Sequence, residues 1–150
     1  MLLDELTEFA DGVAVAGAAG TYNVGDIIDT GAVARDIGVG KQPLICTVII
    51  DTAPTGADTC KFQLVSDATS TIATDGSQTV HHATDDIAIA SLPAGTIAMQ
   101  FVLPREGEVY ERYLAIQQVN VGASALADLV VSAFLSLDAP ETRSYPDAAN

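Results

Sequence analysis

Apolar and polar residues alternate along most of this chain with a period of two, which is the periodicity of β-strands. In 59–65, for example, Phe62 and Leu64 fall on one predicted face, and Lys61 and Gln63 fall on the other. The same alternation, or a short apolar run, predicts further strands at 13–16, 26–29, 44–51, 69–74, 78–84, 97–103, 113–121 and 129–137. No helical pattern alternates with these segments. The expected fold is therefore all-β, a jelly-roll-like β-sandwich rather than a parallel βαβ sheet.

Glycine and proline mark the expected connections between these strands. They predict a loop over 17–25, a long ordered loop over 31–43 and a hairpin turn at 75–76. The first ten residues fit either a short helix or an extended arm. The last residues, 138–150, have little apolar content and read as an arm over the surface or over a partner.

Composition supports one folded domain over residues 1–150, with arms at about 1–12 and 138–150. The chain is 49% apolar and only 17% charged, which argues against disorder. With 20 acidic and 6 basic residues its net charge is −14, so neither nucleic acid nor an anionic membrane is an expected partner. The acidic N-terminus does not resemble a signal peptide, and no apolar run has the length of a transmembrane helix.

The two cysteines, Cys46 and Cys60, lie in apolar segments. If 44–51 and 59–65 form a hairpin around Pro54, Cys46 lies about four positions from the residue opposite Cys60, which is too far for a disulfide. We therefore expect two buried, reduced thiols.

The strongest catalytic suggestion is the sequence Asp29-Thr30-Gly31, which follows two isoleucines. It resembles the active-site turn of retroviral-type aspartic proteases, in which two such turns meet in a homodimer and the aspartates share one proton. The second sequence element that those proteases need downstream has no good match in this chain. The favoured interpretation is that Asp29 ends a strand and caps a turn.

Other candidate chemistry is weaker. His81 and His82 are adjacent, so on a regular strand they point to opposite faces and cannot easily share a metal. A solvent-facing edge strand is the expected setting for both. No nucleophile elbow, phosphate-binding loop or metal-ligand spacing supports an enzyme, and no cofactor is expected.

Two clusters of charge stand beside apolar runs, Arg35-Asp36 and Glu111-Arg112-Tyr113. They fit local surface salt bridges, which contribute under about 1 kcal/mol each. Alternatively, Arg35 or Arg112 binds a partner surface through bidentate hydrogen bonds from its guanidinium group.

Several segments, spread over nearly the whole chain, are distinctive in their order and spacing: 2–6 with 9–11, 29–40, 92–95, 111–114, 133–138 and 145–146. Together they resemble the capsid cement (decoration) proteins of tailed bacteriophages, of the type described on a short-tailed Bordetella phage. The stretch from Ala34 to Gly40 is the most specific, and the middle of the chain matches poorly.

The resemblance implies a non-enzymatic jelly-roll protein on the outer capsid surface of the virion, assembled in the host cytoplasm. Its implied partners are the major capsid protein and further copies of itself, as a homodimer or homotrimer. The alternatives are an aspartic protease that uses Asp29, or another β-rich virion component such as a tail or fibre-base protein. The predicted contact residues, placed on the arms and charged segments, are Leu6, Phe9, Arg35, Asp36, Ile37, Arg112, Tyr113, Arg143 and Tyr145.

Overall fold

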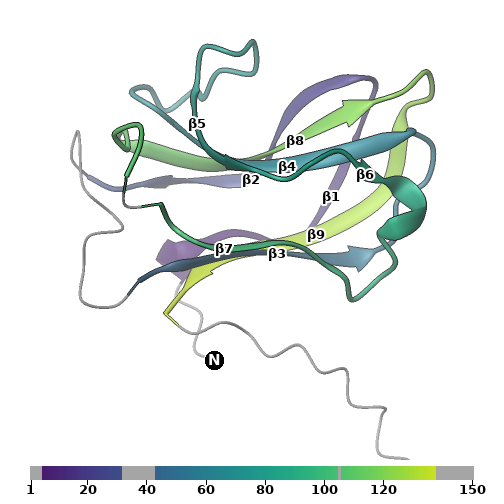
Figure 1. Ribbon diagram of the computed structural model, residues 1–150, viewed down its shortest axis with the longest axis horizontal. Helices are drawn as coiled ribbons and strands as arrows, with labels where there is room; N and C mark the ends of the chain where they lie inside the picture. The colour runs from purple at the N-terminus through teal and green to yellow at the C-terminus, as the bar shows by residue number, and fades with distance from the viewer. Residues whose placement is uncertain (1–4, 32–42, 105, 138–150) are drawn as a thin grey trace, which may run out of the picture.

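The computed structural model describes residues 5–31, 43–104 and 106–137, which form a sandwich of two antiparallel β-sheets (Figure 1). The strands are β1 (Glu8–Gly17), β2 (Gly20–Asp29), β3 (Ile45–Thr52), β4 (Thr59–Asp67), β5 (Thr79–Ala83), β6 (Ile87–Ala88), β7 (Ile97–Val102), β8 (Tyr113–Val121) and β9 (Leu126–Ser136). Two short 3₁₀ helices accompany them, η1 (Glu5–Thr7) and η2 (Ile89–Ser91).

The strand order is that of a jelly roll. Sheet A has the order β1-β9-β3-β7, and sheet B has the order β2-β8-β4-β5, with β6 pairing with β4 as well. Each sheet therefore interleaves strands from the two halves of the chain, as expected when one long hairpin is rolled up. The predicted fold class, an all-β sandwich of the jelly-roll type, is confirmed.

The core lies between the sheets and follows from the alternation in the sequence. Cys46, Val48 and Ile50 point inward from β3, and Phe62 and Leu64 point inward from β4; all five are fully buried. Burying a side chain of the size of Val, Leu, Ile or Phe contributes roughly 1.5–3 kcal/mol, so no disulfide is needed to hold a core of this size. Both cysteines are free and buried, as predicted.

One part of the cysteine argument was wrong. Strands β3 and β4 do not form a hairpin, because β3 lies in sheet A and β4 in sheet B. The turn around Pro54 carries the chain across the sandwich instead. Burial raises the pKa of Cys46 to about 12 and that of Cys60 to about 11, so both side chains are neutral thiols at ordinary pH.

The glycine-rich segment 17–25 is not the predicted loop. Most of it is β2, which follows β1 after the two residues Ala18 and Ala19. Gly25 has φ +64°, and a Cβ there would overlap the Phe9 carbonyl oxygen. Glycine is therefore used inside this strand to let β1 and β2 approach closely, a role that composition does not distinguish from a loop.

The predicted strand 69–74 and hairpin at 75–76 were also wrong. These residues belong to the connection between β4 and β5, and β5 pairs with β4 itself. Ile72, which is 2% exposed, packs with Val65 and Ala115 on the outer face of sheet B. The apolar residue that suggested a strand is explained by this second, smaller core.

Eight strand ends meet at one end of the sandwich, which we call the arm end. The first residues of β1, β3, β5 and β8 and the last residues of β2, β4, β7 and β9 lie there, on the left in Figure 1. Strand β1 begins at Glu8, so the predicted arm over 1–12 overlaps a strand. The rest of that arm, the 31–43 loop and the arm over 138–150 lie largely outside the described residues.

Candidate interaction site

The arm end carries a charged pair that joins β2 to β8. The guanidinium of Arg112 donates from Nε to Asp29 Oδ1 and from Nη2 to Asp29 Oδ2, both at 2.8 Å. Asp29 is the last residue of β2, and Arg112 directly precedes β8, which pairs with β2. The predicted local salt bridge between Arg112 and the adjacent Glu111 was wrong, because Arg112 forms its salt bridge with Asp29, 83 positions away in the chain.

Backbone and hydroxyl groups fix this pair in place. The Thr30 hydroxyl donates to the Arg112 carbonyl at 2.8 Å, and the Gly31 N–H donates to Asp29 Oδ1 at 2.8 Å. Gly31 has φ +76°, which suits glycine at such a turn. The interpretation that Asp29 ends a strand and caps a turn is confirmed.

The same contacts explain the electrostatics of Asp29. The hydrogen bonds from Arg112, then the bond from Gly31, lower the pKa of Asp29 to about 2. An aspartic protease requires two carboxylates that share one proton near its working pH. A carboxylate that holds a guanidinium on both oxygens is a poor candidate for that role, so this geometry does not favour the protease alternative.

Tyr113 extends the pair toward the outer face of sheet B. The Arg112 guanidinium carbon lies 5.0 Å from the centre of the Tyr113 ring, a cation–π distance. Tyr113 is partly buried and packs with Ile27 against the second core. Arg112 and Tyr113, both predicted contact residues, thus lie together with a guanidinium that is positioned by its neighbours on both sides.

Exposed apolar side chains gather at the same end. Leu6 is 78% exposed, Leu137 is 57% exposed and Val102 is 50% exposed. Leu6 precedes β1, Leu137 follows β9, and Val102 is the last residue of β7. Val109, also exposed, belongs to the connection that leaves β7. Because β1 and β7 are the two edges of sheet A, Leu6 and Val102 lie on opposite sides of the sheet at this end.

The remaining predicted contact residues divide into two groups. Phe9 is fully buried in the main core, so it is unavailable for contact with a partner, and its place on the N-terminal arm was wrong. The others lie outside the described residues: Arg35, Asp36, Ile37, Arg143 and Tyr145. Their segments join the described fold next to Gly31 and Leu137, both at the arm end.

The two histidines do not point to opposite faces. Leu64 pairs with His82 and Val65 pairs with Val80, so His81 is an extra residue in a β-bulge. Both rings therefore contact residues of the main core: His81 stacks on Tyr110 with ring centres 3.9 Å apart, and His82 stacks on Phe101 at the same distance. Strand β5 is an edge strand, as predicted, but both histidine rings are only partly exposed and stack on aromatic rings instead of facing solvent.

Burial explains the titration of this pair. Desolvation lowers the pKa of His81 to about 4 and also lowers the pKa of His82. Nε2 of His81 lies 2.7 Å from the Ser66 hydroxyl oxygen, which also accepts a hydrogen bond from the Glu111 N–H at 3.1 Å. The Ser66 hydroxyl and the neutral imidazole therefore share a hydrogen bond, in which the tautomer of the ring sets the donor.

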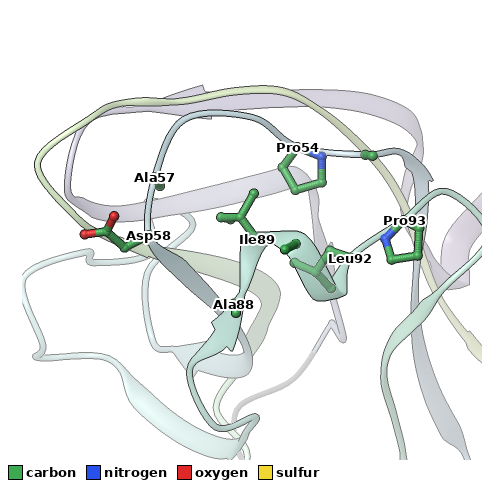
Figure 2. A pocket seen from close by; sticks show the side chains of 9 residues that line it. Pro54, Ala57, Asp58, Ala88, Ile89, Leu92 and Pro93 are labelled. Carbon is green, nitrogen blue, oxygen red and sulfur yellow. The ribbon is translucent and has the colours of Figure 1, made fainter.

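A shallow apolar pocket of about 560 Å³ lies at the end opposite the arm end (Figure 2). Its walls come from the connection that follows β3 and from the β6–η2 region, and the lining residues are Ala53, Pro54, Ala57, Asp58, Ala88, Ile89, Ala90, Leu92 and Pro93. In Figure 2 the Asp58 carboxylate points away from Ile89, Leu92 and Pro54. The walls are thus aliphatic, with no pair of polar groups aimed at a common point.

Among the described residues, no group of three or more histidines, cysteines and acids is placed to hold a metal ion. Within the same residues, no helix has the length and apolar character needed to span a bilayer.

The fold is an all-β sandwich, and exposed aliphatic side chains and the Arg112–Asp29 pair lie at its arm end. The model of the Bbp16 family matches residues 9–135, so the chain belongs to that family. Bbp16 is a family name from a Bordetella phage, and membership fits a structural protein of a phage virion. A search of curated proteins found no match. The predicted relation to phage virion proteins is supported at this level.

Proposed function

We propose that this chain is a capsid cement protein that binds the outer surface of a tailed-phage head and links major capsid proteins to one another. The observation that carries the proposal is the membership in the Bbp16 family over residues 9–135, combined with a jelly roll whose exposed aliphatic residues gather at one end. The resemblance of the Ala34–Gly40 segment to cement proteins supports the same role.

The physical properties of the domain suit a mechanical link. Two antiparallel sheets packed on one core make a stiff body. Binding of many copies across a lattice adds weak individual contacts into a strong whole. The net charge of −14 keeps decorated particles apart in suspension. The proposal includes self-association of the chain as a homodimer or homotrimer. It includes no catalytic step.

Co-sedimentation tests the proposal. Purified protein is mixed with undecorated, expanded heads of the matching phage, and the pelleted protein is measured against its concentration. We expect saturable binding near one copy per major capsid subunit, together with greater heat resistance of the heads.

Absence of binding to correct heads would refute the cement role. The tail or fibre-base alternative would then be tested by immunogold labelling of virions, which locates the protein on head or tail. The protease alternative predicts cleavage at acid pH that is lost in Asp29→Asn, and cleavage unaffected by that change would exclude it.

A further inference from the structure

The edge strands of the two sheets differ in how their free backbone groups are protected. Strands β1 and β7 are the edges of sheet A, and β2 and β5 are the edges of sheet B. Charged side chains, prolines and bulges on an edge strand hinder the pairing of a further strand with it. Strand β1 carries Glu8 and Asp11 and has three register shifts, and β2 carries Asp26 and Asp29 and has one shift. Both of these edges are therefore protected.

Strand β7 lacks this protection. Its sequence, Ile97–Val102, contains no charged residue and no proline. Its register against β3 shifts at Ala98, and the stretch from Met99 to Val102 is regular. The remaining edge strand, β5, is only five residues long and contains the His81 bulge. Among the described strands, β7 is therefore the edge that a further strand fits best.

The hydrogen bonds of β7 show which of its backbone groups are free. The Leu103 N–H donates to the carbonyl of Leu44, directly before β3, at 2.9 Å. Bonded and non-bonded positions alternate in an antiparallel ladder, so Phe101 also bonds to β3, whereas Gln100 and Val102 point their N–H and C=O groups away from it. Both residues are exposed, and β3 is the only described strand that pairs with β7. These backbone groups are therefore open to a partner strand.

The side of the sandwich that carries β7 is uncharged. Strand β5 lies on the same side, because His82 stacks on Phe101, and Figure 1 shows β5 and β7 in front of the other strands of their sheets. Neither strand contains Asp, Glu, Lys or Arg, and burial lowers the pKa of both histidines, so that both are neutral near pH 7. The acids of the adjoining connections lie beyond the strand ends: Asp75, Asp85, Asp86, Glu106 and Glu108.

We propose that β7 pairs antiparallel with β7 of a second copy of this chain, so that sheet A continues from one copy into the other. With Phe101 on the two-fold axis, Gln100 of each copy lies opposite Val102 of the other. The free N–H and C=O groups of both residues then bond across the interface. This inference deepens the self-association that is part of the proposed function, and it names the strand that carries it.

A second copy is the occupant because it meets the two requirements of this edge. An added strand must have free backbone groups of its own and must bring no charge to the uncharged side. Strand β7 of another copy has both properties, whereas the β1 and β2 edges carry two acids each. Each copy carries a net charge of −14, so an uncharged side is also where two copies meet with the least repulsion.

The geometry fixes the stoichiometry and the salt dependence. Pairing of β7 with itself about a two-fold axis uses the same surface on both copies and is complete in a dimer, so no trimer forms through it. The acids beyond the strand ends repel those of the other copy. Added salt screens this repulsion, and the dimer should therefore become tighter as the salt concentration rises.

Proline substitution tests the pairing. Gln100→Pro and Val102→Pro each remove an N–H that points away from β3, so the ladder with β3 stays in place. The control is Ala83→Pro: the Thr84 N–H bonds to Phe62 on β4, so the Ala83 N–H points away from β4 on the neighbouring edge strand. Sedimentation velocity of the full-length chain, without heads, measures association. We expect a wild-type dimer, a roughly tenfold weaker dimer or a monomer for both β7 variants, and no change for Ala83→Pro.

Amide hydrogen exchange of the wild type provides a test that needs no variant. Exchange at Gln100 and Val102 should slow as the protein concentration rises, because their N–H groups are bonded only in the dimer. Exchange at Phe101 should change little, because its N–H bonds to β3 in either state. Thermal unfolding shows whether each proline variant is folded, and an unfolded variant leaves the decision to these exchange rates.

Several outcomes would overturn the inference. A wild type that is monomeric or trimeric would do so, as would a dimer that both β7 variants leave unchanged or that weakens on added salt. If the Gln100 amide is protected only when the protein is bound to heads, the added strand belongs to the shell and not to a second copy. Head binding is measured separately, so the loss of this inference leaves the cement role standing, and a dimer that binds no heads refutes the cement role alone.

Discussion

Arg112 and Asp29 lie 83 positions apart in the chain and meet through two parallel hydrogen bonds of 2.8 Å. The pair connects the end of β2 to the start of β8 at the arm end. Its geometry is the bidentate one in which a guanidinium matches a carboxylate most closely. Because both side chains are partly exposed, its main measurable signature is in titration rather than in overall stability.

Asp29→Asn should make the free energy of unfolding depend less on pH in the acid range. The folded pKa of Asp29, about 2, lies below its unfolded value of 3.8, so its contribution is present above pH 3.8 and is lost as the pH falls toward 2. Chemical unfolding at a series of pH values measures this. Arg112→Met should reduce the same pH dependence. The double variant should differ little from either single variant in its free energy of unfolding. Additive effects would show that the two residues do not act as a pair.

The histidine pair predicts a loss of stability at higher pH than the aspartate does. His81 is neutral in the fold with a pKa of about 4, against 6.5 when unfolded, so the unfolded state binds more protons between these values. Stability should therefore fall as the pH drops from about 6.5 toward 4. Thermal unfolding across this range measures the fall.

The double variant His81→Phe/His82→Phe is the control for that prediction. Phenylalanine keeps a ring beside Tyr110 and Phe101 but cannot be protonated. The slope of stability against pH between 6.5 and 4 should be smaller than in the wild type. A slope that is unchanged in the double variant would assign the acid sensitivity to other groups.

Gln117→Glu should destabilise the packing of the β4–β5 connection on the outer face of sheet B. Gln117 Nε2 donates to Asn23 Oδ1 at 2.8 Å and to the Ala73 carbonyl at 2.7 Å, and a carboxylate cannot donate to either. Both hydrogen bonds are partly buried and Gln117 itself is fully buried, so losing them costs about 2 kcal/mol. Urea unfolding measures the loss. Gln100→Glu, the same change at an exposed position of β7, should cost much less; equal losses would refute the argument.

Substitution of Gly56 and of Gly76 by alanine distinguishes the cost of backbone strain from the cost of steric overlap. Their φ angles are nearly equal, +94° and +96°, but a Cβ on Gly56 would overlap the Ala125 carbonyl, whereas the space around Gly76 is open. Gly76→Ala should cost about 1 kcal/mol from backbone strain alone. Gly56→Ala should cost about 3 kcal/mol or more, because strain and overlap add. Denaturant unfolding of the two variants gives both values, and similar losses would contradict the prediction.

The alternation of apolar and polar residues was sufficient to predict the regular strands. The strand at 113–121 was predicted with the bounds of β8, and 59–65 lies within β4 with its predicted inward face. The local sequence pattern gave wrong predictions where the position of a residue is set by a contact with a residue distant in the sequence. Gly25 occurs inside a strand because Phe9 lies against it, and Ile72 is buried because it covers sheet B.

The site was predictable only in part for the same reason. The position of Arg112 beside an apolar strand suggested a specific contact, but its partner Asp29 is brought near by the pairing of β2 with β8. The bulge that turns both histidines inward depends on the register of β5 against β4. The exposure of Val102 depends on β7 being an edge strand, which alternation along one segment does not reveal.

The interleaved strand order has a consequence for how the protein is made. The first strand, β1, pairs only with β9 among the described strands, so it has no ladder until nearly the whole chain has left the ribosome. A fold built on such distant pairs closes long loops before it gains their contacts, and it is expected to fold slowly and after synthesis. During that interval the apolar segments of β1 and β3 are without their neighbours and are exposed to aggregation. Folding yield in the cell is then set by the time between the synthesis of the first strand and that of the last.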